Sequence, residues 1–189
     1  MSPPLRCTMT GNHAAKGLAD LLERAADLYG SHDAVEALGE TLSYSELAAA
    51  ARDTACGLLA HGLSAGARVA VYLPKQIETI VSLFAICAAG GVFVPVNPLL
   101  KAQQVGHILR DCGAELLITS PERAALLKSI LTATPTLRRL ILVSRSHQSS
   151  TSPDAASLHF DQLRTHQSHS SLPPVSHHGL AALLYTSGS

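Results

Sequence analysis

Apolar positions follow two different periods along the chain, and together they predict helices and strands in a regular order. Between residues 68 and 143, short unbroken runs of Val, Ile and Leu are separated by stretches whose apolar residues lie three and four positions apart. The unbroken runs indicate strands buried on both faces, and the wider spacing indicates helices that pack on a sheet. The predicted strands are 68–73, 92–96, 115–119 and 139–143, and the predicted helices are 76–89, 101–112 and 120–131.

The order of these elements predicts the fold class. Strands that alternate with helices are typical of an α/β fold with a mostly parallel sheet flanked by helices, and each crossover should be right-handed. Ahead of this region, Leu and Ala at positions 18, 21, 22, 25 and 28 predict a helix with one buried face. A hairpin with its turn at Gly39-Glu40 is expected next, then a helix that Ser45 caps and Gly62 ends.

The pattern changes after residue 143. Residues 144–178 are rich in Ser, His, Pro and Thr and hold six of the ten histidines. They predict a surface loop, with a short ordered piece at 158–163. A metal site in this loop is disfavoured because metal ligands need fixed geometry. Residues 180–185 return to an apolar strand. We therefore expect a flexible tail over residues 1–14 and a single partial domain over residues 15–189.

Charge and composition narrow the classes of function. The chain is 47% hydrophobic and has 14 basic and 14 acidic residues, so it is formally neutral. Neutrality argues against a partner among the nucleic acids, whose phosphates require a basic surface. A basic patch hidden within a neutral total stays open as an alternative, although no run of Lys and Arg occurs. Asp111 and Glu115 are too far apart to make an acid–base pair, and no catalytic residue is assigned.

Two further features concern the location of the protein. Residues 79–96 form an uncharged run whose length reaches the lower limit for a membrane span. Gly90-Gly91 and Pro95 interrupt it, so a buried helix followed by a buried strand is the preferred interpretation. The four cysteines form no C-x-x-C pair, and three of them lie in apolar helical contexts. Buried free thiols and the absence of a signal-peptide pattern predict a cytoplasmic protein.

The stretch that carries candidate chemistry is Thr186-Ser187-Gly188-Ser189. It directly follows the last predicted strand. In open parallel sheets, ligands bind beyond the carboxyl ends of the strands. A glycine permits the turn that points successive amides at an anion, and the hydroxyl groups add donors. These residues therefore predict a phosphate-binding loop. On these four residues alone a plain structural turn is favoured, and no Walker A pattern occurs in the chain.

Longer segments support the phosphate interpretation by resemblance. "ALLYTSGS" resembles the start of the phosphate-binding loop of the AMP-forming acyl-CoA synthetases and related adenylate-forming enzymes. In the same order, the family's N-terminal helices, strands and Asn-Pro turn resemble residues 41–98, and its next helix and strand resemble residues 99–120. The segment "VNPLLKAQQVGHILRDC" is also similar to the corresponding segment of acyl-CoA ligases found beside exosortase systems. The family often has an acidic residue just before the last strand, where this chain reads "SHHGL".

The resemblance implies a two-step reaction. A carboxylic acid would attack the α-phosphate of ATP to give an acyl-adenylate and pyrophosphate, and a thiol such as coenzyme A (CoA) would then take the acyl group. Mg²⁺ would neutralise the phosphates. Thr186 and Ser187 would supply hydroxyl and amide donors, Gly188 would permit the turn, and Ser189 would continue the loop.

The resemblance reaches only the N-terminal portion of such enzymes. It implies that the rest of the loop with its lysine, the acyl pocket and the mobile C-terminal domain lie outside this sequence. The chain is therefore expected to be an N-terminal fragment that is inactive by itself and whose partner is the C-terminal portion of the same enzyme. The alternative is a non-catalytic interaction or binding module derived from this family.

Overall fold

The computed structural model describes residues 17–144, 157–164, 172–174 and 179–186. Within them, a parallel sheet of five strands lies at the centre, in the order β4-β3-β5-β6-β7. The strands are β3 Arg68–Tyr72, β4 Val92–Pro95, β5 Leu116–Thr119, β6 Arg139–Leu142 and β7 Ser157–His159. This arrangement confirms the predicted α/β class and the four strands expected before residue 144.

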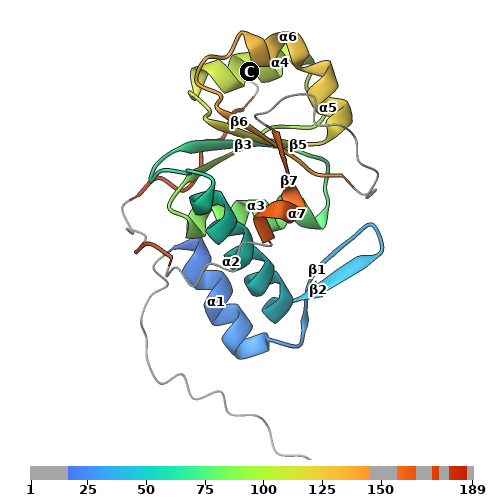
Figure 1. Cartoon of the computed structure of the whole chain (residues 1–189). Helices are drawn as coiled ribbons and strands as arrows, with labels where there is room; N and C mark the ends of the chain where they lie inside the picture. The colour runs from blue at the N-terminus through green and yellow to red at the C-terminus, as the bar shows by residue number, and fades with distance from the viewer. Residues whose placement is uncertain (1–16, 145–156, 165–171, 175–178, 187–189) are drawn as a thin grey trace, which may run out of the picture.

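Helices cover both faces of the sheet (Figure 1). Four pack on one face: α1 Leu18–Tyr29, α2 Tyr44–Ala60, α3 Ile77–Ala88 and α7 Phe160–Arg164. Three pack on the other: α4 Ala102–Asp111, α5 Pro121–Leu126 and α6 Lys128–Thr132. Two separate apolar cores result, because neighbouring residues of a buried strand point to opposite faces. Val69 and Val71 lie in the first core, and Ala70 and Tyr72 lie in the second.

The predicted hairpin is present beside α2 as β1 Asp33–Ala37 and β2 Glu40–Ser43. Its turn places Leu38 and Gly39 at φ 56° and 82°. Two consecutive positive φ angles give the twist that a two-residue hairpin turn needs. The expected N-cap was wrong, because Ser43 and not Ser45 caps α2. Ser43 can also form the reciprocal bond with Glu46 three residues later, which Ser45 cannot.

Two helix predictions need correction. In α1 only Leu22 is buried, whereas Leu18, Leu21 and Leu28 are exposed. The helix therefore packs through a narrower face than its leucines suggest, with Ala19 and Ala26 beside Leu22. The helix predicted over 120–131 is split at Leu127, whose φ of −95° and ψ of 1° leave the helical region. Leu127 is fully buried in the second core, so packing decides the break.

The ordered piece predicted at 158–163 exists, and it is buried, not superficial. β7 extends the sheet by pairing with β6, and Phe160 and Leu163 of α7 enter the first core. α7 lies directly against Gly57 of α2, where a side chain would collide with the Leu163 backbone. The absence of a side chain at Gly57 thus permits this part of the predicted 144–178 loop to join the core.

The strand predicted at 180–185 is not formed. The structure has a single parallel bridge there, between Ala182 and Phe93 at the free edge of β4. The Phe93 N–H donates to the Ala181 carbonyl, and the Phe93 carbonyl accepts from the Leu183 N–H, both at 3.0 Å. The next residue of β4 that faces this edge is Pro95, which has no N–H to offer. Pairing therefore stops after one bridge.

Candidate functional site

The structure places only the first of the four predicted phosphate-loop residues. Thr186 is exposed, directly after Tyr185, and Ser187, Gly188 and Ser189 lie outside the described residues. The geometry that bears on the candidate loop is therefore that of the segment leading into it, residues 180–186, which we call the entry segment. Its contacts determine where the loop begins.

The entry segment lies against the β4 edge of the sheet and both helical layers. Besides the bridge to Phe93, the Ala181 carbonyl faces the Cys87 thiol of α3 at 4.0 Å. Leu183 packs on the opposite side, against the second core. Leu180 and Leu184 are 56% and 71% exposed, so the outer side of the segment faces solvent. The segment is held along one side only within the part of the chain that the structure describes.

Tyr185 makes the contact that fixes the end of the entry segment. Its hydroxyl donates a hydrogen bond to the carboxylate of Asp111, the last residue of α4. Burial raises the pKa of Tyr185, and the hydrogen bond to Asp111 raises that pKa further. Sequence reasoning missed this pair. Asp111 was considered only as an acid–base partner of Glu115, and nothing in the local sequence links it to a residue 74 positions away.

This contact places the Tyr185 hydroxyl near one end of the sheet. α4 connects two parallel strands, so it runs opposite to them and its last turn lies near the amino ends of the strands. Asp111 is five positions before the first residue of β5, and the charge of Arg68 at the start of β3 acts on Tyr185. The Tyr185 hydroxyl therefore lies on the side of the amino ends. The position of the loop beyond the carboxyl ends stays a prediction, because Ser187, Gly188 and Ser189 lie outside the described residues.

The carboxyl ends of the strands carry a well-bonded loop. The Arg123 guanidinium lies 4.5 Å from the centre of the Tyr72 ring and donates to the Pro98 carbonyl at 2.8 Å. The Tyr72 hydroxyl donates to the Leu100 carbonyl at 2.9 Å. The Thr119 hydroxyl donates to the Tyr72 carbonyl at 2.9 Å. These polar groups bond to other groups of the same chain, and they hold the residues that follow β4 in place.

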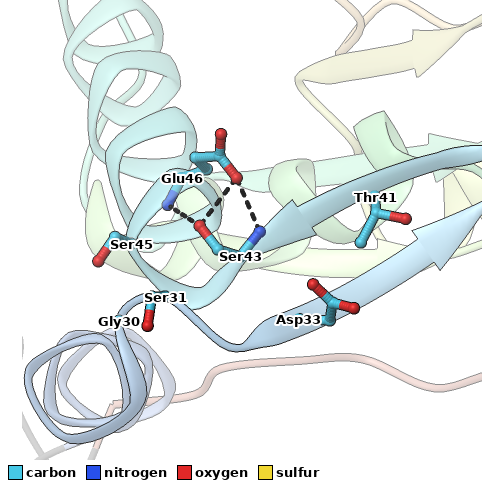
Figure 2. A pocket seen from close by; sticks show the side chains of 7 residues that line it. All are labelled: Gly30, Ser31, Asp33, Thr41, Ser43, Ser45 and Glu46. Carbon is cyan, nitrogen blue, oxygen red and sulfur yellow. Dashed lines mark hydrogen bonds between the residues drawn. The ribbon is translucent and has the colours of Figure 1, made fainter.

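A shallow depression of about 530 Å³ lies between α1, the hairpin and the start of α2. Figure 2 shows its lining, in which the Ser43 hydroxyl and the Glu46 carboxylate cap the first turn of α2. The Glu46 carboxylate accepts from the Ser43 backbone N–H at 2.9 Å, and this bond together with the Ser43 hydroxyl lowers the pKa of Glu46. Glu46 and Asp33 make the depression acidic. It is therefore unsuited to an anion, and the cap accounts for its polar residues.

Two negative findings concern the described residues. No cluster of His, Cys, Asp and Glu in them could hold a metal ion. No helix among them has the length and apolar character to span a membrane, and the uncharged run 79–96 is divided between α3 and β4. Cys56, Cys87 and Cys112 are buried free thiols, as predicted, and Cys7 lies outside the described residues.

The fold and the entry segment define a class of protein. A parallel sheet with helices on both faces, bordered by an apolar segment that leads into Thr186, is the architecture of the N-terminal subdomain of adenylate-forming enzymes. The chain belongs to the AMP-binding enzyme family, whose model matches residues 22–189. The sequence-based resemblance to this family is thereby confirmed.

The curated proteins similar to this chain include a CoA ligase and a synthase. The long-chain-fatty-acid–CoA ligase of Salmonella typhimurium is 33% identical over 137 residues, which are 72% of this chain and 24% of the relative. Tyrocidine synthase 3 of Brevibacillus parabrevis is 35% identical over 118 residues, which are 62% of this chain and 2% of that protein. The chain thus spans about a quarter or less of these two curated relatives.

Solved structures of other proteins share the fold of this chain over most of its length. The anthranilate CoA ligase AuaEII, solved with anthranoyl-AMP, has a TM-score of 0.80 and 25% identity, and the match covers 90% of this chain and 32% of AuaEII. A long-chain-fatty-acid-CoA ligase from Archaeoglobus fulgidus has a TM-score of 0.79 at 21% identity, over 95% of this chain and 36% of that one. The latter similarity supports the fold.

Proposed function

We propose that this chain is the N-terminal part of an AMP-forming acid–thiol ligase and contributes the start of its phosphate-binding loop. In that reaction a carboxylate oxygen bonds to the α-phosphorus of ATP and pyrophosphate leaves. A thiol sulfur, such as that of CoA, then bonds to the acyl carbon as AMP leaves. The match of the family model through Thr186–Ser189 is the observation that carries the proposal. A second support is the fold shared with AuaEII, whose solved complex contains anthranoyl-AMP.

The residues suit a phosphate ligand better than a metal ligand. Thr186, Ser187 and Ser189 carry hydroxyl and amide donors, the groups that stabilise negative charge on phosphate oxygens. The described residues offer no carboxylate cluster for Mg²⁺. Mg²⁺ prefers to bind through phosphate oxygens while it keeps several waters, so it would accompany ATP. The described residues contribute structure and the approach to the loop, and we assign no catalytic residue among them.

We further propose that the 189-residue chain has no turnover alone, and that it acts in the cytoplasm with a carboxylic acid, ATP and CoA as ligands of the whole enzyme. The acyl pocket and the adenylation lysine would come from residues outside this span, as the family resemblance implies. The narrower likeness to exosortase-associated ligases stays a proposal. One observation favours the alternative of an interaction module, namely the exposure of Leu180 and Leu184 on the outer side of the entry segment.

MgATP binding to the 189-residue chain, measured by calorimetry, tests the proposal. The chain should bind MgATP. Ser187→Ala should weaken binding by about 10- to 150-fold, since a hydrogen bond to a charged acceptor contributes about 1.5–3 kcal/mol. Gly188→Val should also weaken binding, because valine disfavours the turn that glycine permits. Ser64→Ala, at an exposed serine in the turn before β3, is the matched control and should bind like the wild type. Carboxylate-dependent pyrophosphate exchange should be absent. Equal affinity in all four proteins would remove the loop from the proposal, and no MgATP binding by the wild type would support the interaction module.

A further inference from the structure

The hydrogen bond between Tyr185 and Asp111 is the last contact that the described residues show before Thr186. The entry segment is paired on one side only, and Pro95 prevents that pairing from continuing along β4. A chain held by a single bridge has considerable freedom to move away from the edge. A side-chain bond at Tyr185, one residue before the candidate loop, removes that freedom at the point where it affects the loop most.

The acceptor belongs to a rigid element. α4 packs into the second core through Val105, Ile108 and Leu109, which are at most 6% exposed. The end of such a helix has a fixed position, so a hydrogen bond to Asp111 also fixes the position of the Tyr185 hydroxyl. The Tyr185 hydroxyl reaches this carboxylate from a segment whose hydrogen bonds, among the described residues, otherwise run to β4 and α3. The bond therefore adds a polar contact to the layer against which Leu183 already packs.

Asp111 is also at an unfavourable place for helix stability. The carbonyl groups at the end of a helix carry partial negative charge, so a carboxylate in the last turn is repelled and a cation is preferred there. Asp111 is the last residue of α4, next to Arg110, which satisfies that preference. A residue that breaks a local rule is expected to have a compensating role elsewhere in the structure. Acceptance of the Tyr185 hydrogen bond is such a role.

We propose that Asp111 is a positioning residue, which fixes the start of the Thr186–Ser189 loop by holding the Tyr185 hydroxyl at the end of α4. The inference rests on the proposed function, since it assigns a task to the approach of that loop. Asp111 does not touch a phosphate in this scheme. It acts through Tyr185, which holds the first residue of the loop in one position when the loop binds its ligand.

Two buried thiols provide an independent readout of the entry segment. Cys87 is 5% exposed and its thiol faces the Ala181 carbonyl, and Cys112, 6% exposed, directly follows Asp111. We expect release of Tyr185 from α4 to increase the exposure of both thiols, because Ala181 lies beside Cys87 and Cys112 lies near enough to Tyr185 to act on its pKa. Cys56 of α2, which is 8% exposed, lies among other helices and is not covered by the entry segment, so it is an internal reference. Cys7 lies outside the described residues, and Cys7→Ser removes its signal.

The experiment compares three variants in the Cys7→Ser chain. Tyr185→Phe removes only the hydroxyl, Asp111→Ala removes the acceptor, and Asp111→Asn keeps an oxygen that can accept the same bond. Tyr29→Phe and Asp53→Ala are matched controls at exposed positions of α1 and α2. Each protein is assayed for the rate at which a thiol reagent labels each cysteine, located by mass spectrometry, and for its dissociation constants for MgATP and inorganic pyrophosphate.

Tyr185→Phe and Asp111→Ala each remove one charge-assisted hydrogen bond. Each should therefore raise the labelling rates of Cys87 and Cys112 about tenfold and leave the rate at Cys56 unchanged. Each should also weaken MgATP binding about tenfold. Asp111→Asn and both controls should stay within about twofold of the wild type. A chain that carries both Tyr185→Phe and Asp111→Ala should lose no more than either single variant. Unchanged labelling would overturn the anchoring, and raised labelling with unchanged MgATP affinity would overturn the positioning role. A wild type that binds neither MgATP nor pyrophosphate would refute the proposed function, and labelling alone would then decide the anchor.

Discussion

Gly57→Ala should destabilise this protein, although alanine is usually the better helix residue. In a helix interior, alanine is favoured over glycine by roughly 1 kcal/mol. At Gly57, however, an added Cβ would lie 2.2 Å from the Leu163 carbonyl oxygen and 2.6 Å from the Leu163 Cα, where ordinary contacts begin near 3.4 Å. Backbone atoms cannot move aside as a flexible side chain can. α7 must therefore shift by roughly 1 Å, the difference between those contacts.

The magnitude follows from what α7 buries. Leu163 is fully buried and Phe160 is 4% exposed. Each such side chain contributes about 1.5–3 kcal/mol by burial, so complete release of α7 would cost about 3–6 kcal/mol. A partial shift of an overpacked element costs about 1–3 kcal/mol. After the helix-propensity gain of roughly 1 kcal/mol, the free energy of unfolding should fall by about 0–2 kcal/mol for a partial shift and by about 2–5 kcal/mol for complete release of α7.

Urea denaturation followed by circular dichroism measures this change. Ala49→Gly is the matched control, because Ala49 lies on the exposed face of the same helix and reports the propensity term alone. Leu163→Ala should cost about 2–5 kcal/mol in the wild type and less in the Gly57→Ala chain, where Leu163 is already displaced. Stabilisation by Gly57→Ala equal to the loss from Ala49→Gly would refute the steric reasoning.

Three further predictions concern other parts of the structure. Ser43→Ala removes the N-cap of α2 and should lower the free energy of unfolding by about 1 kcal/mol by the same assay, whereas Ser45→Ala should change it little. Thr54→Val should leave that free energy unchanged or raise it by up to about 1 kcal/mol, because the buried Thr54 hydroxyl has no hydrogen-bond partner among the described residues, and a clear loss would show that it has one. Because the pKa of Tyr185 is raised, its contribution to stability is present below the ordinary tyrosine pKa of about 10 and is lost as pH rises from there toward the folded value. An ultraviolet titration should show one tyrosine ionising last, and Tyr185→Phe should abolish that step and flatten the alkaline loss of stability.

Most of the sheet and its helices followed from local sequence alone. The strands at 68–72 and 116–119 are unbroken apolar runs, and only a sheet buried on both faces requires such runs. Spacing in 101–112 matches α4, whose Val105, Ile108 and Leu109 are buried as predicted. The Thr-Ser-Gly-Ser loop was likewise visible as a motif, because its meaning lies in consecutive residues.

The entry segment could not be predicted in the same way. An apolar run at 180–185 is a good strand sequence, but a strand needs a partner that can bond with it. That partner is β4, whose edge-facing Pro95 has no N–H. The sequence shows that Pro95 interrupts the uncharged run 79–96, and it does not show which neighbouring segment this proline would limit.

The sequence by itself determined the class of fold, the family and the identity of the candidate loop, since each depends on residues close together along the chain. Only the tertiary structure decided that Tyr185 meets Asp111, that Gly57 admits α7 and that Leu127 divides a helix. These outcomes depend on which surfaces meet after the chain has folded. Packing contacts and hydrogen bonds between residues far apart in the sequence set them, and a local pattern does not say which distant residues will meet.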